Sequence, residues 1–340
     1  MIDSGYIAQL RDRTSCRIIM LSILALFMIV GFFFSLSYGS LKISYGEIIQ
    51  AIIEPVNNIN RQIIWNIRLP RTVTGALVGI CLSIAGAILQ GVMRNPLAGP
   101  NLIGVTSGGG LAAIVILIVL PEYIHLLVPA AFIGALCTTV IIYMLAWKHG
   151  VQPMRLILAG IAVSSLLGAV MSSLMLFFPD RVAGTIDFMI GGLSARSWRH
   201  FNIIWPYAVI GSVAASGMSK RLNIMSLGDE MAGSLGVNVE ISRMALIAIS
   251  ALLAAAAVSV AGLLGFVGLM VPHIMRLIVG SDHRFLFPAC ILFSAGLMMF
   301  CDTIGRLVLD PVELPVGIIM AFLGAPFFLF LLRRKRNHAA

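Results

Sequence analysis

The sequence predicts an all-α integral membrane protein with ten transmembrane helices, and three observations predict it. Hydrophobic residues make up 59% and charged residues 11% of the 340 positions, and the mean hydropathy is +1.01. An ordinary globular chain has roughly 45–50% apolar and about 25% charged residues. Long charge-free stretches follow one another, and basic residues gather on alternate loops. This composition excludes a soluble enzyme, a disordered chain and a disulfide-stapled secreted domain.

Cutting the chain at every charged residue leaves nine long apolar stretches: 18–41, 72–93, 95–121, 123–147, 156–179, 200–219, 244–275, 285–301 and 314–332. About 20 helical residues cross a hydrocarbon core of about 30 Å. The stretch 244–275 is too long for one span, and it holds residues that weaken or kink a helix: Gly262, Gly265, Gly268 and Pro272. We therefore expect two spans there and ten in all.

The basic residues support this split and set the orientation. With the N-terminus inside, ten spans leave 15 Lys and Arg residues in the cytoplasm and 8 outside, whereas nine spans leave 10 inside and 13 outside. Cytoplasmic loops retain positive charge, so we expect ten spans with both termini cytoplasmic. The net charge of +9 then reflects these loops and not nucleic-acid binding.

The expected organisation is one membrane domain with short ends. The first apolar run follows a basic N-terminus, but it is longer than a 7–15-residue signal-peptide core and no A-x-A-like site follows it, so we expect a retained helix. A cytoplasmic segment over 1–17 precedes a single transmembrane domain over 18–333, and a basic cytoplasmic tail covers 334–340. A weak inverted repeat is visible in two spans of opposite direction, since SIAGAIL from Ser83 resembles SVAGLL from Ser259; such repeats are frequent in transporters.

Signatures of membrane enzymes are missing from the sequence. It holds no H-E-x-x-H, no G-x-S-x-G and no G-x-x-x-x-G-K-[ST], and its six histidines are dispersed without metal-ligand spacing. The expected spans also lack the buried charge pairs of proton- or sodium-driven carriers, Asp302 being the main acidic residue near a span. We expect no catalytic residue, no metal site and an energy supply from a partner ATPase. The alternatives are an ion-coupled secondary transporter and an intramembrane enzyme.

The longest cytoplasmic loop, about 221–243, predicts a short helix outside the membrane. Ser226 could cap it, Asp229 and Glu230 suit its first turn, and Gly236 could end it in a left-handed conformation. Its apolar residues recur at four-residue spacing and share one face: Leu227, Met231 and Leu235. A short helix with an exposed apolar edge is a candidate docking element, and an amphipathic linker on the bilayer is the alternative.

From Arg68 to Leu332 the chain resembles the permease subunits of ABC importers for iron–siderophores, haem and vitamin B12. The resemblance rests on separate motifs in order: RLPR from Arg68, GAILQ from Gly86, RNPLAGP from Arg94, LGDEMA from Leu227, GFVGL from Gly265 with Pro272-His273, GSDHR from Gly280 and ELPVG from Glu313. The resemblance implies a type II importer fold with ten helices per subunit, the same number as the span count.

The resemblance also implies the partners and the location. The partners are a second copy of the chain, two ATP-binding subunits, an extracytoplasmic substrate-binding protein and membrane lipid, without nucleic acid. ATP and magnesium belong to the ATPase subunits, and this chain binds no cofactor and is not itself an enzyme. The implied place is the bacterial cytoplasmic (inner) membrane. The implied cargo is an iron chelate, with a ferric siderophore as first choice and haem or cobalamin next.

Three groups of site residues follow from the resemblance. The segment that couples to the ATPase comprises Leu227, Gly228, Asp229, Glu230, Met231, Ala232, Leu235 and Gly236. Acidic residues of the binding protein are received by Arg68, Arg71 and Arg306, because the planar arginine fork pairs bidentately with carboxylate; anchoring of helix ends at the interface is the alternative. The cytoplasmic gate is assigned to Asn95 and Leu97, and to Pro153 and Met154, where the vitamin B12 importer usually has small hydroxyl residues. For Pro153 and Met154 a plain helix-terminating turn is the alternative.

Overall fold

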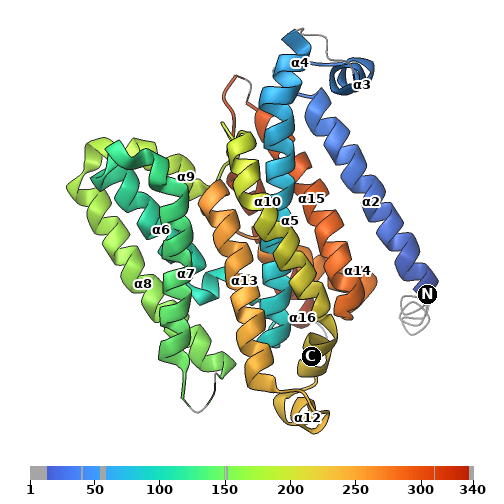
Figure 1. The fold of residues 1–340 in the computed structure, drawn as a ribbon, viewed down its shortest axis with the longest axis vertical. Coiled ribbons are helices and arrows are strands. Elements are labelled where there is room, and N and C mark those ends of the chain that lie inside the picture. The colour runs from blue at the N-terminus through green and yellow to red at the C-terminus, as the bar shows by residue number, and fades with distance from the viewer. Residues whose placement is uncertain are drawn as a thin grey trace.

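The computed structural model describes residues 14–39, 41–53, 59–148, 150, 152–309 and 311–336. They form a bundle of helices that run mostly along one axis (Figure 1). The expected cytoplasmic segment 1–17 and tail 334–340 therefore lie partly outside the described residues. In chain order the elements are α2 (Thr14–Ser37), α3 (Tyr45–Ile53), α4 (Ile59–Ile63), η1 (Ile64–Arg68), α5 (Leu69–Val92), η2 (Pro100–Ile103), α6 (Val105–Ile114), η3 (Val115–Val119), η4 (Pro121–Leu126), α7 (Leu127–Ala146), α8 (Pro153–Phe177), η5 (Pro179–Thr185), α9 (Ile186–Ile190), α10 (Trp198–Gly217), α11 (Ser219–Met225), α12 (Asp229–Ser234), α13 (Val239–Ala261), α14 (Val267–Val279), α15 (His283–Leu307) and α16 (Val316–Arg336).

The described helices establish a multi-pass membrane protein. Six are long and apolar enough to cross a bilayer, and α10 with α11, bent by 55°, forms a seventh if the pair is one span. Three further apolar helices are shorter: Val105–Val119, Val267–Val279 and Val316–Phe330. The described residues thus hold six or seven candidate spans, and ten spans with both termini cytoplasmic stay a prediction.

The predicted break in the stretch 244–275 is confirmed. α13 ends at Ala261 and α14 begins at Val267. Gly262 stands between them at φ +78°, and a Cβ there would overlap the carbonyl oxygen of Phe188. The N–H of Leu263 donates to that carbonyl at 2.9 Å, and the N–H of Gly192 donates to the carbonyl of Ala261 at 2.9 Å. α9 and the irregular segment that follows it therefore satisfy the backbone groups that the broken helix exposes.

α5 is the central helix of the bundle and begins earlier than expected. The apolar cut placed its span at 72–93, whereas a helical run of 34 residues covers Ile59–Val92 through α4, η1 and α5. The difference arises because Arg68 and Arg71 are buried inside the fold and do not mark the end of the span. A Cβ at Gly86 would overlap the carbonyl oxygen of Gly268, so α5 and α14 meet backbone to backbone.

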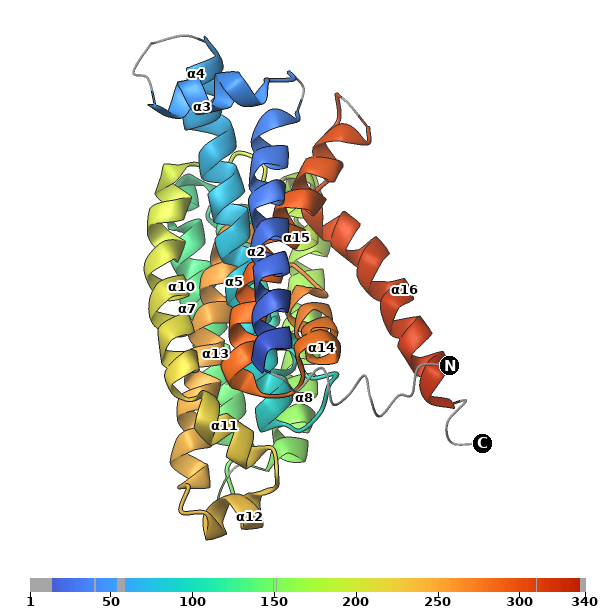
Figure 2. The same ribbon diagram turned by 90° about the vertical axis from the view of Figure 1, so that its right-hand side faces the viewer.

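The two ends of the bundle carry different small elements. α3 and α4 lie at one end and α12 lies at the other, while α16 leans away from the remaining helices (Figure 2). In the most apolar window of α8 only 11% of the residues are buried, against 83% in the helical run that ends with α5. α8 therefore offers its surface to lipid or to another subunit.

Candidate functional site

The segment expected to couple to an ATPase forms a short helix at the end of the bundle. Gly228, at φ +119°, precedes α12, and Gly236, at φ +79°, follows it. The N–H of Val237 donates to the carbonyl of Ala232 at 3.0 Å, and the N–H of Gly236 donates to that of Gly233 at 3.0 Å. This left-handed ending is the one predicted for Gly236, and it satisfies carbonyls that the helix end leaves free.

The predicted cap at Ser226 is wrong. Ser226 directly follows α11 with helical dihedral angles (φ −66°, ψ −18°), whereas a residue that caps the start of a helix has extended backbone. Its hydroxyl donates to the carbonyl of Asn223 at 2.6 Å, so it closes the preceding helix. Gly228 takes the position ahead of α12 instead, because the chain must reverse there at a positive φ.

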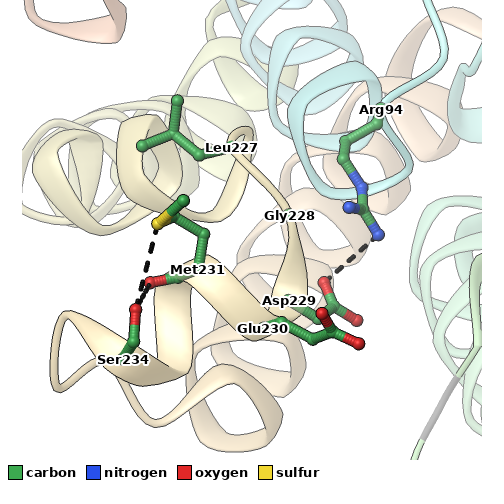
Figure 3. Close-up of a pocket in the computed structure, with 7 residues that line it drawn as sticks. All are labelled: Arg94, Leu227, Gly228, Asp229, Glu230, Met231 and Ser234. Atoms are coloured by element: carbon green, nitrogen blue, oxygen red, sulfur yellow. Dashed lines mark hydrogen bonds and ion pairs between the residues drawn. The ribbon is translucent and has the colours of Figure 1, made fainter.

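The predicted apolar edge is present. Leu227, Met231 and Leu235 are 65%, 55% and 56% exposed, whereas Ala232 on the opposite side is fully buried. A groove of about 630 Å³ runs along this helix and is lined by Arg94, Leu227, Gly228, Asp229, Glu230, Met231 and Ser234 (Figure 3). Three exposed large apolar side chains at the tip of the bundle form a surface that suits another protein or the bilayer surface.

Asp229 fixes α12 to the rest of the fold. Its carboxylate accepts a hydrogen bond from Arg94 Nη2 at 3.2 Å, as Figure 3 shows, and one from Arg243 Nη2 at 2.7 Å. Arg94 follows α5 and Arg243 belongs to the first turns of α13. The Arg243 side chain is 3% exposed and also pairs with Glu240 at 3.5 Å. Sequence reasoning assigned Asp229 to the helix dipole and missed that it joins α12 to two transmembrane helices.

Removing this carboxylate is expected to loosen α12. We predict that Asp229→Ala raises amide hydrogen exchange over residues 226–237 about tenfold, because two charge-assisted hydrogen bonds contribute on the order of 1–2 kcal/mol at this partly exposed position. The matched control is Glu230→Ala, an exposed carboxylate on the next residue. Equal exchange in the two variants would show that Asp229 does not anchor the helix.

The three arginines expected to receive a binding protein lie at the other end of the bundle. Arg68, Arg71 and Arg306 are only 5%, 7% and 7% exposed. Arg68 donates to the carbonyls of Leu36 and Ser37, at 2.6 and 3.1 Å, and to that of Leu41. Their guanidinium groups therefore already have partners inside the chain.

Two carboxylates hold the other two arginines. Asp302 accepts hydrogen bonds from Arg71 Nε and Nη2, both at 2.9 Å, and lies 3.3 Å from Arg306 Nε. Glu313 Oε2 pairs with Arg71 Nη1 at 2.7 Å and accepts a hydrogen bond from the Ser194 hydroxyl at 3.2 Å. Burial raises the pKa of Glu313, but the hydrogen bond and the charge of Arg71 outweigh it, so its pKa lies below the ordinary value. Glu313 is therefore ionised at neutral pH.

The structure nevertheless brings the three arginines together. They share a cavity of about 220 Å³, which is lined by Gly39, Leu41, Ile63, Ile67, Arg68, Arg71, Arg306 and Glu313. The carboxylate partners were missed, although Glu313 opens the ELPVG motif and Asp302 is the main acidic residue near a span. Docking by these arginines stays a prediction, and their internal pairs give them a structural role besides it.

The residues assigned to a cytoplasmic gate lie in the turn after α5 and at the start of α8. Asn95 and Leu97 follow α5, and the Asn95 side chain accepts the N–H of Leu97 at 2.9 Å. Leu97 is 51% exposed. Pro153 is the first residue of α8, and Met154 after it is 66% exposed. Leu97 and Met154 are therefore both exposed in the single chain, and the gate itself stays a prediction.

Comparisons with known proteins show which family and which relatives the chain is similar to. The pattern of the FecCD transport family matches residues 26–334. The chain is 38% identical over 312 residues to the Fe(3+)-citrate import system permease protein YfmE of Bacillus subtilis, covering 92% of this chain and 93% of the relative. It is 37% identical to the hemin transport system permease protein HmuU of Yersinia pestis, covering 94% and 96%. It is 40% identical to the cobalamin import system permease protein BtuC of Halobacterium salinarum, covering 89% and 81%.

A solved structure shares the whole fold. A metal-chelate type ABC transporter in an inward-facing conformation superposes with a TM-score of 0.82 at 28% identity, covering 92% of this chain and 98% of that one. PsaBC of Streptococcus pneumoniae, at 16% identity and a TM-score of 0.58, is similar in fold alone. Among the described residues, no group of three or more His, Cys, Asp or Glu side chains is placed to hold a metal ion.

Proposed function

The chain belongs to the FecCD transport family and is a transmembrane permease of an ABC importer in the cytoplasmic membrane, and from this premise we propose its working assembly. Two copies form the pathway between them, two ATP-binding subunits attach at the α12 end, and an extracytoplasmic binding protein docks at the α3–α4 end. Each copy crosses the membrane ten times, with both termini in the cytoplasm. ATP and magnesium are bound by the ATPase subunits.

The exposed edge of α12 is the observation that carries this proposal. Leu227, Met231 and Leu235 enter a cleft of the ATPase, and Asp229 ties their helix to α5 and α13 through Arg94 and Arg243. A short helix held by ion pairs moves as a rigid body, so a displacement by the ATPase reaches the membrane helices. Without these bonds the movement would be absorbed in a loose loop.

The opposite end of the bundle supports docking of the binding protein. Arg68, Arg71 and Arg306 line one cavity, and the surrounding charge favours an incoming carboxylate. Cargo then passes between the two copies, and the turn at Asn95–Leu97 together with Pro153 and Met154 at the start of α8 closes the cytoplasmic side. The pathway alternates between its two gates as ATP is bound and hydrolysed.

The cargo class follows from the relatives. Three relatives are named for the import of Fe(3+)-citrate, hemin and cobalamin. All three cargoes are metal chelates. We therefore assign a metal chelate to this permease, with a ferric siderophore as first choice and haem or cobalamin next.

Crosslinking tests the attachment of the ATPase. In a variant without the five native cysteines, Met231→Cys is expected to form a crosslink to the ATPase subunit in the purified complex, because its side chain is 55% exposed at the apolar edge. Ile53→Cys in α3, 73% exposed at the other end of the bundle, is the matched control and should link to no ATPase. A Met231→Cys complex without a crosslink, or cargo uptake by vesicles that lack the ATPase, would contradict the proposal.

A further inference from the structure

One side chain joins the segment that leads into α12 to the start of α15. Asn223 lies in α11, and its Nδ2 donates to Asp282 Oδ1 at 2.7 Å. Its Oδ1 accepts the backbone N–H of His283 at 2.9 Å and lies 2.6 Å from His283 Nδ1. Because a carboxylate and an amide oxygen only accept, these contacts assign the proton of His283 to Nδ1. Three polar contacts from one amide hold α11 against α15.

Other partners of Asp282 do not involve α11. Arg284 donates to Asp282 Oδ2 at 2.7 Å, yet it belongs to α15 itself and its side chain is 56% exposed. Arg17 of α2 lies 3.8 Å from the same carboxylate. The pKa of Asp282 is about 2, mainly because of the hydrogen bond from Arg284, so the carboxylate is charged at neutral pH. Asn223 and Arg284 thus touch the same group, but Asn223 alone of the two links it to the coupling end.

The far end of α15 lies beside the cavity that Arg68, Arg71 and Arg306 line. Asp302 is 3% exposed and pairs with Arg71, while Arg306 donates to the Ser35 hydroxyl at 2.9 Å. From His283 to Asp302 the helix rises by about 28 Å. A single helix therefore carries a bonded group at each end, one beside the coupling segment and one at the cavity assigned to docking.

The middle of α15 is packed tightly enough to move as a unit. A Cβ at Gly79 of α5 would lie 2.7 Å from the carbonyl oxygen of Ser294, and the hydroxyls of Ser83 and Ser294 are 3.0 Å apart. Pro288 lies in the second turn, and the helix continues beyond it to Leu307. Close-packed interiors transmit a displacement, and a buried ion pair opposes being stretched because an unpaired buried charge is costly.

We propose that α15 is a second strut, beside the α5 connection through Asp229 and Arg94, that links the docking end of the permease to its coupling segment, with Asn223 as the positioning residue at the inner joint. This inference rests on the proposed function. A movement of α12 pulls α11, Asn223 passes it to the start of α15, and α15 passes it to Arg71 and Glu313. Coupling between two binding sites is reciprocal, so ATP at one end changes the affinity for the binding protein at the other.

The test measures this reciprocity in the full complex in lipid nanodiscs. The dissociation constant of the cargo-free binding protein is measured with and without a non-hydrolysable ATP analogue. For the unaltered complex we expect the two constants to differ at least about fivefold. For Asn223→Ala we expect the ratio to fall at least about twofold and not to vanish, because α12 stays joined to α5 through Asp229 and Arg94. The nucleotide-free constant should change less than about twofold, because Asn223 lies far from the docking end.

Two further variants make the result specific. Arg284→Ala removes a partner of the same carboxylate without touching α11, and it should keep the full ratio. Asn223→Asp keeps an acceptor for His283 but sets a negative charge against Asp282. It should therefore lower the ratio of the two dissociation constants as Asn223→Ala does. This variant also provides the test if the alanine variant does not assemble.

Three outcomes would overturn the proposal: a full ratio in both Asn223 variants, an equal loss in Arg284→Ala, or failure of both Asn223 variants to assemble, which would make Asn223 a folding residue. A failure of the proposed function looks different. In that case the unaltered complex itself would show no nucleotide effect and no crosslink from Met231→Cys.

Discussion

Replacing Asp302 with alanine is expected to lower the free energy of unfolding by about 3–5 kcal/mol, because it leaves the buried Arg306 without a carboxylate and leaves the buried Arg71 with Glu313 alone. Asp302 is 3% exposed, and it pairs with Arg71 at 2.9 Å and with Arg306 at 3.3 Å. The measurement is unfolding of the purified chain in mixed micelles, followed by helical circular dichroism as the denaturing detergent increases. A decrease in the free energy of unfolding of less than about 1 kcal/mol would contradict a structural role for the ion pairs of Asp302.

A double variant separates structure from docking. Arg71→Met with Asp302→Leu removes one buried positive and one buried negative charge, and replacing a buried pair by apolar residues of similar volume is often neutral. We expect it to recover at least half of the stability lost in Asp302→Ala. If Arg71 also docks the binding protein, the stable double variant should bind that protein at least about tenfold more weakly. Unchanged binding would leave Arg71 with the structural role alone.

Gly86→Ala is the second change with a large expected effect. The added Cβ would overlap the carbonyl oxygen of Gly268, and both atoms belong to the meeting backbones of α5 and α14. A backbone oxygen cannot rotate away as a side chain can, so the two helices must separate. Overpacking costs typically about 1–3 kcal/mol and sometimes more; we expect the upper end, measured by the same unfolding in mixed micelles.

Gly168→Ala is the matched control in this pair. Gly168 lies within α8, and a Cβ there would have no heavy atom within 4 Å in the single chain. Alanine has the higher helix propensity, by up to about 1 kcal/mol, so this variant should be as stable as the unaltered chain or slightly more stable. A Gly86→Ala protein as stable as Gly168→Ala would show that α5 and α14 do not meet at Gly86.

Features that depend on neighbouring residues could be predicted. The break after Ala261, the left-handed Gly236 and the exposed faces of Leu227, Met231 and Leu235 all agree with expectation. The cap at Ser226 failed because α11 extends helical backbone through that residue. A short-range pattern cannot show where the preceding helix ends.

Features that depend on residues distant in the sequence could not be predicted. Cutting the chain at charged residues left Arg68 and Arg71 outside the span 72–93, yet Arg71 is buried and paired with Asp302, 231 positions away in the chain. Likewise Asp229 suited a helix start by its charge, and its bonds to Arg94 and Arg243 appeared only when α5 and α13 came together. A carboxylate in the sequence names no partner, because pairing depends on which helices pack side by side.

The composition of the sequence by itself predicted a multi-pass membrane protein. The motifs of the sequence predicted an importer permease, and the family match agrees with both predictions. Water is absent from a hydrocarbon core, so apolar length and backbone hydrogen bonding leave few choices there. The arrangement of helices settled which charged groups are buried and paired. It also put Asn223 on the start of α15, since contacts between remote segments form only once close packing has set the distances between helices.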